Sequence, residues 1–104
     1  MAYRIEITPT ALEALEAITD RRTRGAVVRR IDTLTEEPGK LGKPLRGWLA
    51  GFMSIRAAGQ RYRVVYRIDD EEKRAIVYMV DIRKEGSRRD VYALAERLVQ
   101  RGLI

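Results

Sequence analysis

Three arginines recur at alternating positions within residues 61–70, which read RYRVVYRIDD. Alternation of this kind is typical of a β-strand that turns one face toward a core. We expect the core face to consist of Tyr62, Val64, Tyr66 and Ile68. The opposite face carries Arg61, Arg63 and Arg67, and we expect it to lie in solvent. Because arginine offers a planar fork of donors and stays charged at any working pH, this row predicts a surface that binds phosphate groups.

The segment around this strand is also basic. Residues 38–68 contain no aspartate or glutamate, whereas the chain as a whole has 15 acidic and 21 basic residues and a net charge of +6. The basic residues of the segment are Lys40, Lys43, Arg46, Arg56, Arg61, Arg63 and Arg67. Such a distribution favours an anionic partner, without choosing among nucleic acid, a membrane surface and an acidic protein.

The composition excludes several kinds of active site. The 104 residues include no histidine and no cysteine, so Ser-His and Cys-His mechanisms, thiolate metal sites and disulfides are excluded. We expect no cofactor and no metal. Metal-independent RNA cleavage remains open, because the 2′-hydroxyl can attack the neighbouring phosphate if the protein supplies a proton acceptor, a proton donor and positive charge. Arginine provides the charge, and tyrosine or lysine can exchange the protons if nearby cations favour that exchange.

Hydrophobic periodicity and turn residues divide the chain into seven elements. In order, they are a strand at 3–7, a helix capped by Thr8 with Pro9 first, a helix beginning at Asp20, strands at 51–56, 61–68 and 75–80, and a helix from Val91 with Gly102 as its C′ residue. Residues 36–44, EEPGKLGKP, interrupt the pattern as a loop.

This order, β-α-α-β-β-β-α, predicts an α+β fold with a single domain over residues 1–104. We expect a twisted, mainly antiparallel four-stranded sheet, a two-helix hairpin on one face and a C-terminal helix. A simple hairpin around residues 57–60, AAGQ, places Arg56 near Arg61. Like charges across a strand pair are unfavourable, and an anion bound between them would relieve the repulsion.

Three segments together resemble the RelE/ParE toxin superfamily. KPLRGWLAGFMSIRAAGQRYRVVYRIDDE resembles its central segment, YRIEITPTALEAL its opening strand and alanine-rich helix, and DIRKEGSRRDVYALAERL its RelE-type ending. The resemblance covers nearly the whole chain and implies the compact RelE-like fold. It also implies a type II toxin that cuts mRNA in the ribosomal A site and is neutralised by a RelB-like antitoxin encoded by the adjacent gene.

The resemblance also assigns candidate residues. Arg63 matches an arginine that stabilises the phosphate, Arg83 a second catalytic arginine, and Tyr92 a tyrosine that stacks on the substrate or exchanges protons with it. The substrate-binding candidates are Arg56, Arg61, Lys84, Arg88 and Arg89.

The chain departs from the RelE pattern on the second strand. RelE-like members carry two lysines there, and this chain has Phe52 and Ser54. Lys84, Arg88 and Arg89 are candidates for replacing the lost charge.

Structural roles compete with the catalytic ones. Tyr92 would serve as a core anchor, and Arg83 as the partner of Asp81 or Glu85 in a surface ion pair. Trp48 and Leu49 fit a core or an antitoxin contact better than base stacking.

Three functions therefore remain open from the sequence. The first is a ribosome-dependent mRNA endonuclease, the second a ParE-like toxin that inhibits DNA gyrase, and the third a non-catalytic basic binding module. No apolar run is long enough for a membrane span, so we expect a cytoplasmic protein with no membrane partner.

Overall fold

The computed structural model describes residues 2–104 and contains one five-stranded sheet in the order β1-β5-β4-β3-β2. Its strands are β1 Arg4–Ile7, β2 Lys43–Pro44, β3 Met53–Ala57, β4 Tyr62–Asp69 and β5 Arg74–Ile82. β1 pairs in parallel with β5, and the other neighbours are antiparallel. The α+β class and the mainly antiparallel sheet are confirmed, but the expected count of four strands is wrong. The two-residue strand β2 lies in the stretch that was expected to be a loop.

Within the described residues, four α-helices complete the fold, beside two three-residue 3₁₀ helices at Thr33–Thr35 and Gly47–Leu49. The α-helices are α1 Pro9–Glu16, α2 Arg21–Asp32, the short α3 Pro38–Leu41 and α4 Val91–Gln100. The hydroxyl of Thr8 caps α1, and a carboxylate oxygen of Asp20 caps α2, as the sequence predicts. No helix within residues 2–104 is long and apolar enough to cross a membrane.

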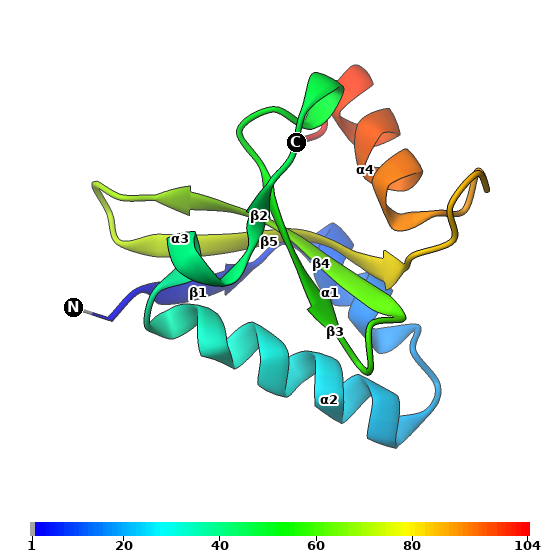
Figure 1. Cartoon of the computed structure of the whole chain (residues 1–104), viewed down its shortest axis with the longest axis horizontal. Coiled ribbons are helices and arrows are strands. Elements are labelled where there is room, and N and C mark those ends of the chain that lie inside the picture. Colours follow the sequence, from blue (N-terminus) through cyan, green and yellow to red (C-terminus); the bar gives the residue numbers. More distant parts are fainter. Residues whose placement is uncertain (1) are drawn as a thin grey trace.

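Helices cover both faces of the sheet (Figure 1). α1 and α2 pack on one face through a buried cluster that includes Leu15, Ile31 and Tyr66. α4 packs on the other face, over a second cluster that includes Phe52 and Val65. The predicted core face of β4 is confirmed. The opposite face lies in solvent only in part: Arg67 is exposed and Arg63 is half-buried, but Val65 is fully buried beneath α4.

β5 contributes side chains to both clusters, and its alternation is interrupted once. The pairing of β4 with β5 shifts register between Val65 and Tyr66. Val77 and Val80 therefore join the α1–α2 cluster, and Tyr78 and Met79 both face α4. The result is a central strand that packs on both of its faces.

The ends of α4 fix its position beside the sheet. Asp90 is its N-cap, and its side chain accepts a hydrogen bond from the Tyr92 N–H. At the other end, Gly102 adopts a φ of 71°, and its N–H and that of Leu103 bond back to the carbonyls of Val99 and Leu98. This pattern is a Schellman motif, which confirms the expected role of Gly102.

Candidate functional site

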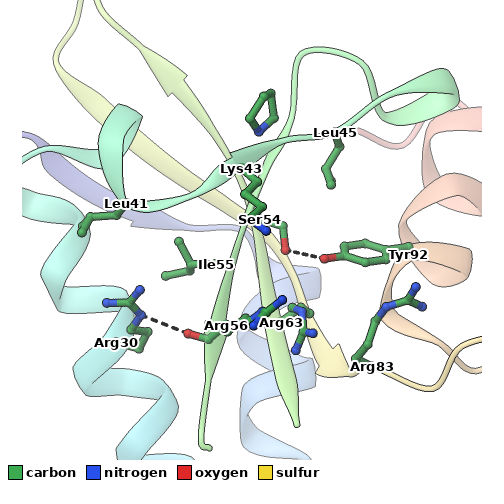
Figure 2. Close-up of a pocket in the computed structure, with 11 residues that line it drawn as sticks. Arg30, Leu41, Lys43, Leu45, Ser54, Ile55, Arg56, Arg63, Arg83 and Tyr92 are labelled. Carbon is green, nitrogen blue, oxygen red and sulfur yellow. Dashed lines mark hydrogen bonds between the residues drawn. The ribbon is translucent and has the colours of Figure 1, made fainter. Parts of the chain in front are cut away.

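A cationic cavity opens between the sheet, α2 and the start of α4 (Figure 2). Its volume is about 460 Å³, and no carboxylate is among the side chains that line it. The lining residues are Arg30, Leu41, Lys43, Pro44, Leu45, Ser54, Ile55, Arg56, Arg63, Arg83 and Tyr92.

Four residues that the sequence singled out meet in this cavity. Arg56 on β3 and Arg63 on β4 lie on adjacent strands, and Arg83 and Tyr92 lie on the side of α4 (Figure 2). The three proposed catalytic side chains therefore come from separate parts of the chain and line one concavity.

The expected register of the hairpin is wrong by two residues. Arg56 lies directly opposite Arg63, and the partner of Tyr62 is Ala57. Arg61 precedes β4 and belongs to the turn, so the alternation of the strand does not extend to it. Its side chain lies in a separate hollow beside the α1–α2 connection, away from the cavity. The like-charged pair across the strands is thus Arg56 and Arg63.

Asp90 holds Arg83 in place. One of its carboxylate oxygens accepts hydrogen bonds from Arg83 Nη1, at 2.7 Å, and from the Lys84 N–H, at 2.6 Å. Burial alone would raise the pKa of Asp90, but the bonds from Arg83, Lys84 and Tyr92 lower it overall. Asp90 in turn raises the pKa of Arg83, so this guanidinium stays protonated. The expected surface pair with Glu85 is present at 3.6 Å but secondary, since the buried Asp90 is nearer.

Tyr92 faces the cavity from the first turn of α4. The guanidinium carbon of Arg83 lies 4.8 Å from its ring centroid, a cation–π distance. Its hydroxyl is hydrogen-bonded to the Ser54 hydroxyl at 2.7 Å. Tyr92 is only partly buried, and it packs against the α4 cluster with its hydroxyl at the cavity. It therefore combines the anchoring role and the exposed phenol that the sequence presented as alternatives.

Three cavity arginines are held by neutral oxygen atoms. Arg30 Nε donates to the Arg56 carbonyl at 3.0 Å. Arg56 Nη1 donates to Gln60 Oε1 at 3.1 Å, and Arg63 Nη1 to the Gln60 carbonyl at 2.5 Å. Within residues 2–104, none of these three arginines forms an ion pair. Their charge is therefore not neutralised by the protein itself.

The close approach of β2 to β3 brings a lysine to the cavity. Lys43 pairs with Ser54 in the sheet, and Gly42 precedes it. A Cβ on Gly42 would lie 2.8 Å from the Ser54 carbonyl oxygen and would collide with the Tyr66 hydroxyl. That hydroxyl is buried and donates to the Pro38 carbonyl at 2.6 Å, and burial raises the pKa of Tyr66 to about 12. Only glycine fits at this position without displacing β2.

Sequence reasoning selected neither Arg30 nor Lys43 as a site residue, and several of its candidates lie outside the cavity. Arg30 gave no signal because it lies on a helix outside residues 38–68, and helix arginines are common on protein surfaces. Lys84, Arg88 and Arg89 do not line the cavity. The connection between β5 and α4 turns back on itself through backbone hydrogen bonds from Ser87 to Lys84 and from Asp90 to Ser87, and the Lys84 N–H binds the Asp90 carboxylate.

The loop before β3 has a mixed character. Leu49 is buried under α4, whereas Trp48 is 60% exposed. Neither lines the cavity, so neither can stack on a base bound there. Residues 2–104 also contain no group of three or more acidic side chains arranged to hold a metal ion.

Comparison with known proteins identifies the family. Residues 5–87 match the family described as the ParE toxin of type II toxin–antitoxin systems, parDE. Toxin RelG of Mycobacterium tuberculosis is 38% identical over 89 residues, which span 86% of this chain and 100% of that protein. Toxin RelE of the same organism is 35% identical over 86 residues, spanning 83% of this chain and 87% of that protein.

The chain belongs to the RelE/ParE superfamily of type II toxins.

Solved structures agree with this assignment. The toxin–antitoxin complex RelBE2 of M. tuberculosis has a chain that is 39% identical, with a TM-score of 0.72, covering 80% of this chain and 100% of that one. The isolated E. coli RelE toxin has a TM-score of 0.67 at 21% identity, with 98% and 100% coverage, and supports the fold alone. The RelE-like fold expected from the sequence is confirmed.

In this RelE/ParE toxin, Lys43 lies opposite one of the strand positions at which the RelE pattern has lysine. The resemblance to RelE places two lysines where this chain has Phe52 and Ser54. Lys43 is the cross-strand partner of Ser54, and it lines the cavity from the neighbouring strand. Phe52 is instead buried, with the Arg67 guanidinium 4.9 Å from its ring centroid. Lys43 and Arg30 line the cavity, and Lys84, Arg88 and Arg89 do not.

Proposed function

We propose that this RelE/ParE toxin is a metal-independent endoribonuclease that cuts mRNA in the ribosomal A site. The observation that carries the proposal is the convergence of Arg63, Arg83 and Tyr92 in one cavity that contains no carboxylate. Arg63 is held by a carbonyl oxygen and not by a carboxylate, so its charge suits a phosphodiester, whose negative charge increases in the transition state.

The reaction needs no group beyond the RNA and the protein. The 2′-oxygen forms a bond to the adjacent phosphorus, and the bond from phosphorus to the 5′-oxygen breaks. The products are a 2′,3′-cyclic phosphate and a 5′-hydroxyl, because the 2′-hydroxyl loses a proton and the 5′-oxygen gains one. The protein must therefore stabilise the pentavalent phosphate and assist both proton transfers.

Arginines on two sides of the cavity would supply the charge. Arg56 and Arg63 come from the sheet, and Arg83 comes from the side of α4 (Figure 2). Because Asp90 raises the pKa of Arg83, this residue acts as a fixed positive charge and not as a base. Asp90 is a positioning residue, since it binds both the side chain of Arg83 and the N–H of Tyr92.

Tyr92 is the residue to which we assign proton exchange with the substrate. Its hydroxyl reaches the cavity and is already hydrogen-bonded to the Ser54 hydroxyl. This pair gives the phenol a partner that can accept or donate a hydrogen bond as the proton moves. The stacked Arg83 guanidinium keeps the ring oriented at the same time.

The test is cleavage of a defined mRNA on purified ribosomes, with 5′ ends mapped to the codon. We expect A-site cuts with the wild type and none with Arg83→Ala, while Arg4→Ala, which removes an equal charge at the far end of β1, cuts normally. Circular dichroism of the three proteins excludes a folding defect. Identical patterns for the wild type and Arg83→Ala would contradict the proposal.

The proposed partner is a RelB-like antitoxin encoded by the adjacent gene, and the proposed compartment is the cytoplasm, where ribosomes and mRNA occur. The matched M. tuberculosis structure is itself a toxin–antitoxin complex. An acidic antitoxin segment would complement the cationic cavity and keep RNA out of it. Co-expression of the two genes should restore growth and yield a copurifying complex.

Inhibition of DNA gyrase is the second candidate, because the matching family is the one named for ParE. A supercoiling assay with purified gyrase separates the two functions. Inhibition of gyrase together with intact ribosomal mRNA would favour the ParE-type activity over the nuclease.

A further inference from the structure

The turn between β3 and β4 has an unusual backbone. Three consecutive residues have a positive φ, namely Ala58 at 49°, Gly59 at 65° and Gln60 at 77°. Glycine adopts this region freely, but residues with a Cβ do so uncommonly and at a cost. Gln60 is the last residue of this run and lies next to the two arginines of the hairpin.

Gln60 contacts both arginines, by two different groups. Its main-chain carbonyl accepts from Arg63 Nη1 at 2.5 Å, and its side-chain oxygen accepts from Arg56 Nη1 at 3.1 Å. Because Arg56 and Arg63 are direct cross-strand partners, a single turn residue binds the two like charges that face each other in the sheet.

The chemistry of these acceptors matters for an anion site. Two guanidinium groups on opposed strand positions repel each other, and a carboxylate between them would relieve the repulsion by neutralising them. Carbonyl and amide oxygens orient the same groups with partial charges only, so the full positive charge stays available to a ligand.

We propose that Gln60 is a positioning residue that holds Arg56 and Arg63 as a pair for one phosphate group of RNA. The inference rests on the proposed function, since it assigns Gln60 a part in binding the same substrate. The left-handed backbone at Gln60 brings its carbonyl and its side chain toward the two strands, and the unfavourable φ is retained for that reason.

Paired glycine substitutions separate strain from positioning. Gln60→Gly and Ala58→Gly both relieve a positive φ in the same turn, so both should raise the melting temperature or leave it unchanged. Within residues 2–104, Ala58 makes no hydrogen bond to either arginine, whereas Gln60→Gly loses the bond to Arg56. We expect Gln60→Gly to weaken substrate binding about three- to tenfold, seen as a higher KM with little change in kcat. Ala58→Gly should keep the wild-type KM.

Two further variants identify the mechanism. Gln60→Glu preserves the length of the side chain and adds a carboxylate, so it should weaken binding more than Gln60→Gly does, although it retains an acceptor for Arg56. In an Arg56→Gln background, Gln60→Gly should have no further effect, because its consequence passes through Arg56.

Affinity for a 2′-O-methylated RNA hexanucleotide, which cannot be cut by 2′-hydroxyl attack, provides a readout independent of cleavage. Measured by fluorescence anisotropy at low salt, it should rank wild type and Ala58→Gly first, Gln60→Gly next and Gln60→Glu last. If the affinities follow this ranking but ribosomal mRNA is not cut, the role of Gln60 in anion binding is supported and the nuclease proposal is rejected.

Two results would overturn the inference. In the first, the wild type cuts mRNA, but Gln60→Gly and Ala58→Gly bind the hexanucleotide with equal affinity. The nuclease proposal then stands, and the role of Gln60 is rejected. The other is a wild type that neither binds the hexanucleotide nor cuts mRNA, which rejects both proposals.

Discussion

Two groups of arginines lie on or beside this sheet, and their partners differ. Where β1, β4 and β5 lie together, Arg74 pairs with Asp69 at 2.8 Å and with Glu6 at 3.2 Å, and Arg4 pairs with Glu6 at 3.3 Å. In the cavity, by contrast, Arg30, Arg56 and Arg63 are held by carbonyl and amide oxygens.

The difference shows that the type of acceptor, more than the number of arginines, separates a structural cluster from a binding surface. Asp69 and Glu6 raise the pKa of Arg74 and cancel its charge within the protein, so these contacts join strands. The charges of Arg30, Arg56 and Arg63 are oriented but not cancelled. Arg83 lies between the two cases, because it lines the cavity and also pairs with the buried Asp90.

The largest expected effect is on catalysis. Arg63→Gln removes an uncancelled charge, and single-turnover cleavage on ribosomes should fall about 10²–10³-fold, as for loss of one oxyanion-stabilising group. The matched change Arg74→Gln should lower the melting temperature yet leave the cleavage rate of the folded protein unchanged. Equal rate losses in the two variants would remove the distinction between the clusters.

Substitution of Asp90 should affect both the stability of the protein and the rate of cleavage. Asp90→Ala removes the helix cap and the anchor of Arg83, so unfolding in urea should show a loss of about 1–2 kcal/mol, accompanied by slower cleavage. Asp90→Asn keeps a capping side chain but loses the charge, and it should recover most of the stability while cleavage stays reduced. Full recovery of both quantities by Asp90→Asn would show that the charge of Asp90 has no role in positioning Arg83.

The pH dependence of stability follows from the same carboxylate. The folded protein holds the pKa of Asp90 below its ordinary value of 3.8, so its stabilising contribution is complete above that value. The contribution is lost as the pH falls through the lower, folded-state pKa. The free energy of unfolding, measured by urea titration at a series of pH values, should therefore rise more steeply with pH between pH 2 and pH 5 for the wild type than for Asp90→Asn. At neutral pH the two plots of free energy against pH should run in parallel.

The smallest expected effect is on the salt dependence of binding. Each phosphate contact to a single strand contributes about 0.7 to the slope of log affinity against log salt concentration. Arg56→Gln should reduce the slope for the 2′-O-methylated hexanucleotide by about that amount, and Arg4→Gln should leave it unchanged. A slope that responds equally to both changes would indicate general electrostatic attraction rather than a defined site.

Local sequence signals predicted most of the fold. Thr8, Asp20 and Gly102 marked helix ends correctly, because capping depends on a few neighbouring atoms. The alternation in 62–68 predicted which face of β4 packs on α1 and α2. The short strand β2 was missed because two residues carry no periodicity, and its pairing depends on the absence of a side chain at Gly42.

The site was predictable only in part. Arg56, Arg63, Arg83 and Tyr92 were found through motifs that lie on regular elements or at their ends. Arg30, Asp90 and Gln60 were not, because their roles arise from contacts between segments or from a turn geometry that alternation does not specify. The displacement of Arg61 has the same origin, since the strand begins one residue later than its pattern suggests.

The most direct test of the central claim uses an mRNA with a single 2′-deoxynucleotide immediately 5′ of the cut bond in the A-site codon. With the wild-type toxin and purified ribosomes, we expect cleavage of the all-ribose message to leave a 2′,3′-cyclic phosphate and a 5′-hydroxyl, and we expect the deoxy-substituted message to stay intact. Cleavage of the substituted message at the same bond would contradict the account, because it would show that the 2′-hydroxyl is not the nucleophile.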